Sequence, residues 1–225
     1  MSIAENAARV RESIAAAALR SGRSPASVEL VAVSKTQPLE AVREAVAAGL
    51  TRLGENRPQE LRDKMAAGLN AKWHLIGQLQ RNKIKYVAGK VELIESVDRL
   101  ELLQALQDYC AGHGLHQRIL LQVNLGREPQ KSGFLPEELP QALDLAAACG
   151  NLGVKGLMAV APLVPDSQTL RPLFRSMREL FERVRTPGMD TLSMGMSSDY
   201  PVAIEEGATM VRVGRALFGQ RVPLK

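Results

Sequence analysis

The stretch ELVAVSKTQPLEAVREAVAAG, residues 29–49, contains the repeating unit on which the fold depends. Its first part, residues 29–34, is a short apolar run of the kind that forms a buried strand. Its second part, residues 38–49, has helical periodicity, with Pro at its start and Gly at its end, where these residues commonly border a helix. A strand, a helix and a further strand in succession predict a right-handed crossover between parallel strands.

The same unit recurs along the chain. The further apolar runs that read as strands are residues 51–55, 73–77, 91–96, 118–124, 154–160, 191–195 and 210–214. Most of these runs do not alternate between apolar and polar residues, which indicates burial on both faces. Eight units favour an α/β protein with a single (β/α)8 TIM barrel and an extra N-terminal helix over residues 3–20. The alternative is an open doubly wound sheet, which the absence of G-x-G-x-x-G after the first strand disfavours.

The composition predicts one soluble domain over residues 1–225. The chain is 45% hydrophobic, which is enough for a substantial core. It has no run of about 18 apolar residues and no apolar centre of a signal peptide near its N-terminus, so we expect a cytoplasmic protein without a membrane partner.

The net charge leaves a small phosphate-bearing ligand possible, whereas the cysteines and histidines indicate no metal. The net charge of +5 is a mild excess, and the basic run at residues 80–86 contains one aromatic residue, so nucleic-acid binding is not expected. Cys110 and Cys149 have no metal-ligand spacing and are expected to be buried thiols. His113 and His116 are expected at the surface, and no metal site is predicted.

Polar residues at the ends of barrel strands are the natural candidates for a site, because the loops there converge on the mouth of the barrel. Lys35 ends the first strand, and the period of two places it on the same face as Val33 and Val31. A desolvated lysine amine is suited to form a Schiff base. The alternative is a lysine that extends from the strand end into water.

Arg212 lies between Val211 and Val213 in the last strand, so its guanidinium is expected to be buried and to need an acceptor of fixed geometry. One interpretation is a structural ion pair with Glu55 or Glu95. The other is an anchor for an acceptor atom of a ligand. The spacing alone leaves both open.

Two turns near the C-terminus are typical of a phosphate site. In SMGMSSDYP, Ser197, Ser198 and Asp199 mark the start of a helix after the seventh strand, and Gly214 and Arg215 follow the eighth. Backbone N–H groups at such turns bind phosphate, and the last two strands of a barrel often hold it.

Several other strand ends carry residues with weaker signals. Glu55 and Asn56 are expected within reach of a ligand, and Asn124 and Met158 are expected to line the site without taking part in chemistry. Trp73 and His74 begin the third strand, and both are expected to be packed or hydrogen-bonded core residues.

Taken together, these motifs resemble a known family. The matching segments are AVSKTQP, GENRPQE, WHLIGQLQRNK, KSGF, KGLMAVAP and LSMGMSSDYPVAIEEGATMVRVGRALFG, between about residues 28 and 219. They resemble the pyridoxal phosphate homeostasis protein family, relatives of the N-terminal barrel of alanine racemase. The resemblance implies a fold type III barrel that binds pyridoxal 5'-phosphate (PLP) as a Schiff base on Lys35. It also implies a role in intracellular PLP homeostasis, by buffering the cofactor or delivering it to apo-enzymes.

The resemblance assigns further residues to the cofactor. Ser197, with nearby amides and with Ser193 as a less secure candidate, is implied to bind the phosphate, and Gly214 and Arg215 to complete its cradle. Arg212 is implied to face the pyridine nitrogen.

Asn56 and Met158 are implied to lie beside the ring of the cofactor. Many members of the family have a small residue, often with a hydroxyl group, at the position of Arg215. The backbone N–H of Arg215 is therefore expected to bind the phosphate, but its side chain cannot supply a hydroxyl contact.

The resemblance implies a protein without strong catalytic activity. A cationic Arg212 disfavours protonation of the pyridine nitrogen, which weakens PLP as an electron sink. A racemase also needs a second acid or base on the opposite face, and Tyr86, Tyr109 and Tyr200 are not at strand ends. We therefore expect a PLP-binding protein that is not an enzyme, as a monomer or weak homodimer. A low-activity PLP-dependent amino-acid racemase is the alternative.

Overall fold

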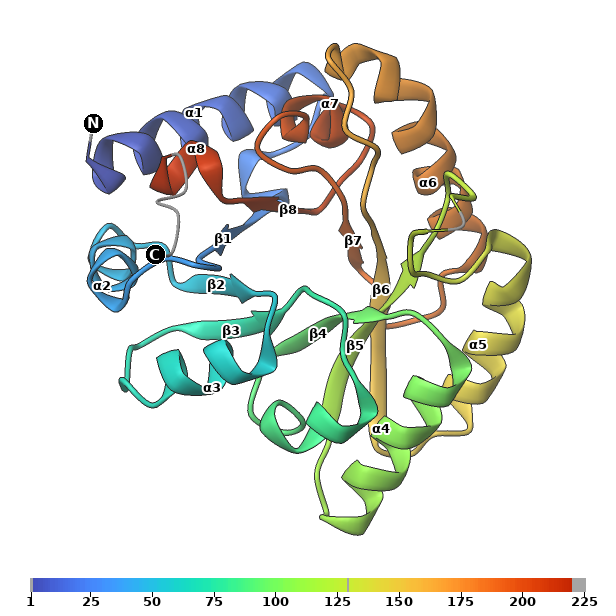
Figure 1. Cartoon of the computed structure of the whole chain (residues 1–225). Helices are drawn as coiled ribbons and strands as arrows, with labels where there is room; N and C mark the ends of the chain where they lie inside the picture. Colours follow the sequence, from blue (N-terminus) through green and yellow to red (C-terminus); the bar gives the residue numbers. More distant parts are fainter. Residues whose placement is uncertain (1, 129, 220–225) are drawn as a thin grey trace.

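The computed structural model describes residues 2–128 and 130–219. Within them, eight parallel strands close into a barrel in chain order, with β8 paired to β1 (Figure 1). The strands are β1 (Glu29–Val33), β2 (Arg52–Glu55), β3 (Lys72–Leu75), β4 (Leu93–Val97), β5 (Gln117–Val123), β6 (Leu152–Ala159), β7 (Thr191–Ser193) and β8 (Met210–Val213). The predicted TIM barrel is confirmed. The expected single domain extends to Lys225, and residues 220–225 lie outside the described part.

Helices surround the barrel, as Figure 1 shows. They are α1 (Ile3–Arg20), α2 (Leu39–Ala47), α3 (Pro58–Met65), α4 (Leu100–Gly112), α5 (Leu139–Ala147), α6 (Arg171–Val184), α7 (Tyr200–Glu205) and α8 (Arg215–Phe218). The extra helix α1 has the predicted bounds, because Ser2 and Glu5 form a capping box at its start. Its apolar face, which includes Val10 and Ile14, is buried, and the helix packs against α7 and α8.

The connection between β3 and β4 is a 3-10 helix, η2 (Arg81–Tyr86), instead of an α-helix. This segment is the basic run of the sequence. The cationic groups of Arg62, Lys83 and Lys85 lie 5.3 to 5.6 Å from the centroid of the Tyr86 ring. Cation–π attraction of this kind stabilises the turn, so the run has a structural explanation within the chain.

The main core lies between the outer face of the strands and the helices. Trp73, Cys110 and Cys149 are buried in it, and both thiols are free, as expected. His113 and His116 are exposed, again as expected. The interior of the barrel holds a smaller aliphatic cluster, made of Val31, Leu93, Leu120, Met158 and Met210. Polar side chains occupy much of the remaining interior.

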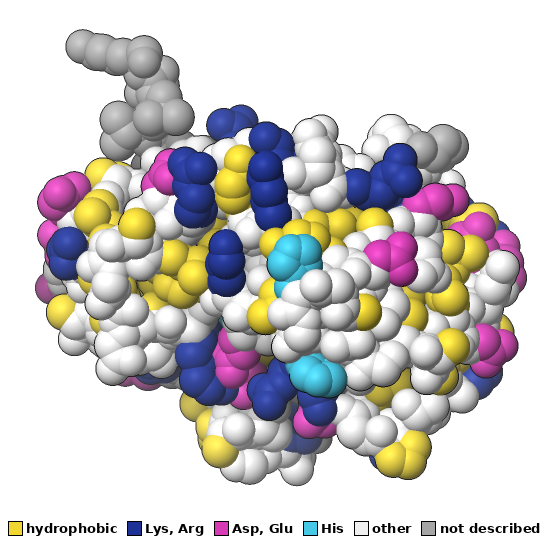
Figure 2. Space-filling view, turned by 90° about the horizontal axis from the view of Figure 1, so that it is seen from below, with side chains coloured by type: hydrophobic (Ala, Val, Ile, Leu, Met, Phe, Trp, Pro, Cys, Tyr) yellow, Lys and Arg dark blue, Asp and Glu magenta, His cyan; other side chains and the backbone are white. Residues whose placement is uncertain are grey.

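On the face shown in Figure 2, Lys and Arg side chains are interspersed with acidic and apolar ones, and they form no continuous basic stripe among the described residues. Extended nucleic-acid sites usually require such a stripe. None of the helices in the described ranges combines the length and the apolar character that crossing a bilayer requires.

Candidate functional site

A pocket of about 670 Å³ opens at the C-terminal ends of the strands, within the size range of small-molecule sites. It is lined by Val33, Lys35, Asn56, Ile76, Val160, Leu163, Met196, Ser197, Ser198, Arg212, Gly214 and Arg215. Six of the eight predicted site residues are therefore brought together in one place. The apolar lining residues Ile76, Val160, Leu163 and Met196 were not predicted, because an apolar side chain near a strand end gives no chemical signal in the sequence.

Lys35 reaches the pocket from a tight turn after β1. Val33 lines the same pocket and Val31 lies in the interior cluster, so the predicted alternation is confirmed. The N–H of Gln37 donates to the carbonyl of Ser34 at 3.0 Å and closes the turn. Within it, Thr36 has a φ of 62°, which is uncommon for a β-branched residue. Lys35, which is half-buried as a residue, is thus presented by a strained turn that its surroundings must hold.

A buried lysine of α3 supports this turn from behind. The Nζ of Lys64 donates to the carbonyl of Ser34 at 2.7 Å, to Oε1 of Glu55 at 2.6 Å and to Oε1 of Glu60 at 2.8 Å. The same Glu60 oxygen accepts the N–H of Thr36 at 2.7 Å. All three protons of the ammonium are satisfied, so Lys64 joins α3 to the turn that carries the pocket lysine.

These contacts correct the prediction for Glu55. Its side chain points out of the barrel toward α3 and does not line the pocket. Burial raises the pKa of the Glu55 carboxyl, although hydrogen bonds from Lys64 and Ser34 act in the opposite direction. Lys64 itself was missed, and its only signal in the sequence is its place four residues after Glu60 in the third helix.

Arg212 forms the buried ion pair with Glu95 that the first interpretation expects, and it also lines the pocket, so its role toward a ligand stays a prediction. Its side chain is only 4% exposed, yet it lines the pocket. Nη1 donates to Oγ of Ser193 and lies 3.6 Å from Oε2 of Glu95, and Nη2 donates to the carbonyl of Ala159 at 2.7 Å. Burial lowers the pKa of Arg212 and the charge of Glu95 opposes this shift. The guanidinium is therefore a fixed cation in the wall of the pocket.

Backbone donors converge on Ser197, which also lines the pocket. The N–H groups of Gly214 and Ala216 donate to its Oγ at 3.1 and 3.4 Å. The N–H groups of Ser197 and Ser198 have no acceptor within the described ranges. A Cβ at Gly214 would lie 3.3 Å from the carbonyl of Val33, so glycine allows this loop to approach β1 closely. Such a cluster of amide donors is suited to bind an anion.

The structure does not bring Ser193 and Met158 to the pocket, which corrects two predictions. Ser193 is fully buried, and its hydroxyl donates to Oε2 of Glu95 at 2.7 Å in the barrel interior. Met158 belongs to the interior aliphatic cluster. Asn124 is not among the lining residues of this pocket: its Nδ2 donates to the carbonyls of Glu128 and Lys131 at 2.8 and 3.0 Å and fixes the loop after β5.

Comparison with known proteins identifies the family. The profile of the alanine racemase N-terminal domain matches residues 4–222. The "Pyridoxal phosphate homeostasis protein" of Aquifex aeolicus is 42% identical over 226 residues, which cover 98% of this chain and 99% of the relative. The chain belongs to the pyridoxal phosphate homeostasis protein family. A second member of this family, from Pseudomonas aeruginosa, is 45% identical over 221 residues, which cover 97% of this chain and 96% of the relative.

A solved structure extends the comparison to the fold. The PipY protein of Synechococcus elongatus, in its structure with PLP bound, is 38% identical to this chain with a TM-score of 0.83. The match covers 96% of this chain and 100% of PipY. The family predicted from the motifs is confirmed.

Proposed function

We propose that the chain binds PLP in the pocket at the C-terminal ends of the strands and takes part in PLP homeostasis. The observation that carries the proposal is that Lys35 and the amide donors around Ser197 line one pocket. An amine that can react with an aldehyde and a cradle that can bind a phosphate match the two polar ends of PLP. Membership of the family supports the same reading.

The residues present fit the parts of the cofactor. Lys35 would hold PLP covalently through its amine. Ser197, with the backbone N–H groups of Ser198, Gly214 and Arg215, would bind the phosphate. Asn56 and the apolar walls of the pocket would contact the ring.

Arg212 would face the pyridine nitrogen. Ser193 and Met158 fit a supporting role in this arrangement, since Ser193 accepts a hydrogen bond from Arg212 and Met158 packs in the barrel interior.

The same residues favour retention of the cofactor over turnover. Bound PLP supplies an electron sink for carbanions, which is strongest when its ring nitrogen is protonated. A fixed guanidinium from Arg212 opposes that protonation. Among the described lining residues, the titratable side chains are those of Lys35, Arg212 and Arg215, and arginine does not exchange protons near neutral pH. In racemisation, Lys35 alone would have to transfer protons on both faces of the cofactor. We therefore propose that the chain is not an enzyme.

The rim of the pocket suits exchange with other proteins. Leu163 lines the pocket although it is 79% exposed, and Val160 beside it is 41% exposed. A cofactor behind such an open rim is accessible from solvent. We therefore propose that the chain releases PLP to apo-enzymes as well as buffering it.

The covalent attachment is tested by trapping. Apo-protein is mixed with PLP, reduced with borohydride and digested, and the modified peptide is mapped by mass spectrometry. We expect the adduct on Lys35, and we expect Lys35→Ala to lose both the adduct and the visible absorbance while its circular dichroism is unchanged. Lys155→Ala is the matched control, because this lysine lies at the opposite end of the barrel. An adduct on a different lysine in the unmodified protein would overturn the assignment.

The alternative function is tested separately. The holo-protein is incubated with amino acids in deuterated water, and exchange of the α-proton is followed by NMR. We expect no sustained exchange. Repeated turnover would establish the low-activity racemase instead.

A further inference from the structure

A row of buried polar side chains crosses the interior of the barrel, starting from the pocket. Nη1 of Arg212 donates to Ser193, and Oγ of Ser193 donates to Oε2 of Glu95 at 2.7 Å. The other oxygen of Glu95 accepts a hydrogen bond from Nδ1 of His74 at 2.8 Å. The row thus passes through β8, β7, β4 and β3. Barrel interiors are usually filled by branched aliphatic side chains, so this arrangement calls for a specific explanation.

The row carries alternating charges, and its charged members are buried. His74 and Glu95 are 1% and 0% exposed. Burial would lower the pKa of His74, but its hydrogen bonds to Glu92 and Glu95 outweigh burial and raise the pKa to about 9. Burial would raise the pKa of Glu95, and the hydrogen bond from His74 and the charge of Arg212 instead hold it below its ordinary value. At neutral pH an imidazolium and a guanidinium therefore share one buried carboxylate.

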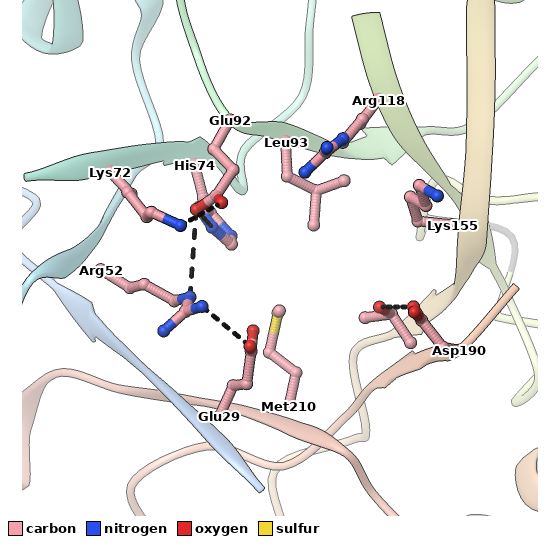
Figure 3. A pocket seen from close by; sticks show the side chains of 11 residues that line it. Glu29, Arg52, Lys72, His74, Glu92, Leu93, Arg118, Lys155, Asp190 and Met210 are labelled. Carbon is pink, nitrogen blue, oxygen red and sulfur yellow. Dashed lines mark hydrogen bonds and ion pairs between the residues drawn. The ribbon is translucent and has the colours of Figure 1, made fainter. Parts of the chain in front are cut away.

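The far end of the row opens into a second pocket, of about 380 Å³, at the N-terminal ends of the strands (Figure 3). Nε2 of His74 lies 3.4 Å from Oε2 of Glu92, which lines this pocket. Glu92 also contacts Lys72 at 2.9 Å and Arg52 at 3.9 Å, and Arg52 contacts Glu29 at 2.9 Å. The other charged groups around the pocket are Arg118, Lys155 and Asp190. His74 can thus exchange its proton with solvent on the side of the barrel away from Lys35.

We propose that His74, acting through Glu95 and Ser193, is a positioning residue that holds the guanidinium of Arg212 against the ring of PLP. This role rests on the proposed function. It links the N-terminal face of the barrel to retention of the cofactor at the opposite face.

The distances indicate how loss of the His74 proton would change the affinity for PLP. Nη1 of Arg212 is 3.6 Å from Glu95, beyond hydrogen-bond distance, because Ser193 lies between them and His74 shares the carboxylate. When His74 loses its proton, Arg212 becomes the cation that must balance Glu95. The guanidinium is then drawn toward the interior, and its contact with the ring weakens. PLP should therefore bind more tightly to the form with protonated His74.

The unmodified protein provides the first test, because binding linkage is reciprocal. If PLP binds fivefold more tightly to the protonated form, the pKa of His74 must rise by about 0.7 when PLP binds. NMR titration of the His74 ring, in apo-protein and in protein with borohydride-reduced PLP, measures this change. A rise supports the proposal. An equal pKa in both states overturns it.

Variants provide the second test. His74→Gln keeps a hydrogen-bond donor to Glu95 but has no charge. We expect its Kd for PLP at pH 7.5 to be about fivefold above that of the unmodified protein, and to lack the additional rise that the unmodified protein shows between pH 8 and 10. Ser193→Ala removes a single oxygen from the row and should likewise weaken binding severalfold. Arg118→Gln, a change in the same N-terminal pocket outside the row, is the control and should bind like the unmodified protein.

The outcomes separate this proposal from the one on which it rests. If both row variants bind PLP with the Kd and the pH profile of the unmodified protein, the positioning role fails while PLP binding stands. If the unmodified protein acquires no PLP on Lys35, both proposals fail. Reduced thermal stability with an unchanged pH profile would mean that His74 is only structural.

Discussion

Lys64 holds the turn that carries Lys35 although it does not line the pocket. Its side chain is 9% exposed, and its ammonium is bound by two carboxylates and a carbonyl. A buried charge of this kind costs free energy unless every partner is in place. One oxygen of Glu55, Oε2, has no hydrogen-bond partner in the described part of the chain. The negative charge of the buried Glu55 is therefore compensated mainly by the ammonium of Lys64.

Replacing this cation should therefore destabilise the protein strongly. We expect Lys64→Met to lower the free energy of unfolding by about 3–5 kcal/mol, because it leaves the Glu55 carboxylate buried without a counter-charge. Urea unfolding followed by circular dichroism measures the loss. The double variant Lys64→Met/Glu55→Leu should regain most of it, since both charges are removed together. Equal unfolding midpoints for the single variant and the unmodified protein would refute this account.

Of the two lysines around this turn, the sequence predicted the position of Lys35 but not that of Lys64. The alternation of Val31 and Val33 in β1 was enough to predict that Lys35 faces the mouth of the barrel, although Lys35 itself lies in the turn after the strand. No comparable pattern marks Lys64, which lies on a short helix rich in charged residues where a solvated side chain is the usual outcome. Its burial follows from how α3 packs on the turn after β1, and a single sequence does not reveal that packing.

For strands, the sequence gives the face of a residue more reliably than its depth. Ser193 and Met158 both point into the barrel, but they lie below the mouth. Depth depends on the stagger between neighbouring strands, which closure of the barrel imposes. A β-bulge between β5 and β6 shifts that register near Leu120, and it has no clear mark in the sequence. The turns around Ser197 and Gly214, which we propose bind phosphate, were easier to place at the pocket, because they follow two consecutive strands.

The close approach of β6 and β7 depends on a glycine. Gly156 has a φ of 152°, and a Cβ there would lie 1.7 Å from the carbonyl of Thr191. Gly153, in the same strand, has open space at the corresponding position. The two glycines therefore form a matched pair within one element.

We expect Gly156→Ala to destabilise the protein by at least about 3 kcal/mol, because the ladder between β6 and β7 must separate to admit the methyl group. Gly153→Ala should change the free energy of unfolding by less than about 1 kcal/mol. Urea unfolding of both variants provides the comparison. Similar losses for the two would show that β7 does not need this close approach.

At the scale of the whole molecule, the rhythm of eight strand–helix units was sufficient to predict the barrel. The contact of the extra helix with this part of the molecule was not predictable, because α1 is far in sequence from the proposed phosphate cradle. In the structure, α1 lies beside α8 (Figure 1). The side-chain amide of Asn6 donates to the carbonyl of Leu217 at 2.8 Å, and this bond is buried. Helix α8 begins at Arg215, directly after Gly214, so α1 holds the element next to the proposed phosphate cradle.

The N-terminal helix should therefore affect cofactor binding without touching the cofactor. We expect Asn6→Ala to raise the Kd for PLP about threefold and to cost about 1–2 kcal/mol of stability, since the Leu217 carbonyl loses a buried donor and α8 is less firmly held. Arg20→Ala is the control on the same helix. Arg20 is 56% exposed and pairs with Glu205 at the surface, so its loss should cost less than about 1 kcal/mol and leave the Kd unchanged. Titration of the two apo-proteins with PLP, followed by absorbance, measures the difference. If both variants bind PLP equally well, α1 stabilises the barrel without ordering the phosphate site, and the cradle must be held by β8 and the loop around Ser197 alone.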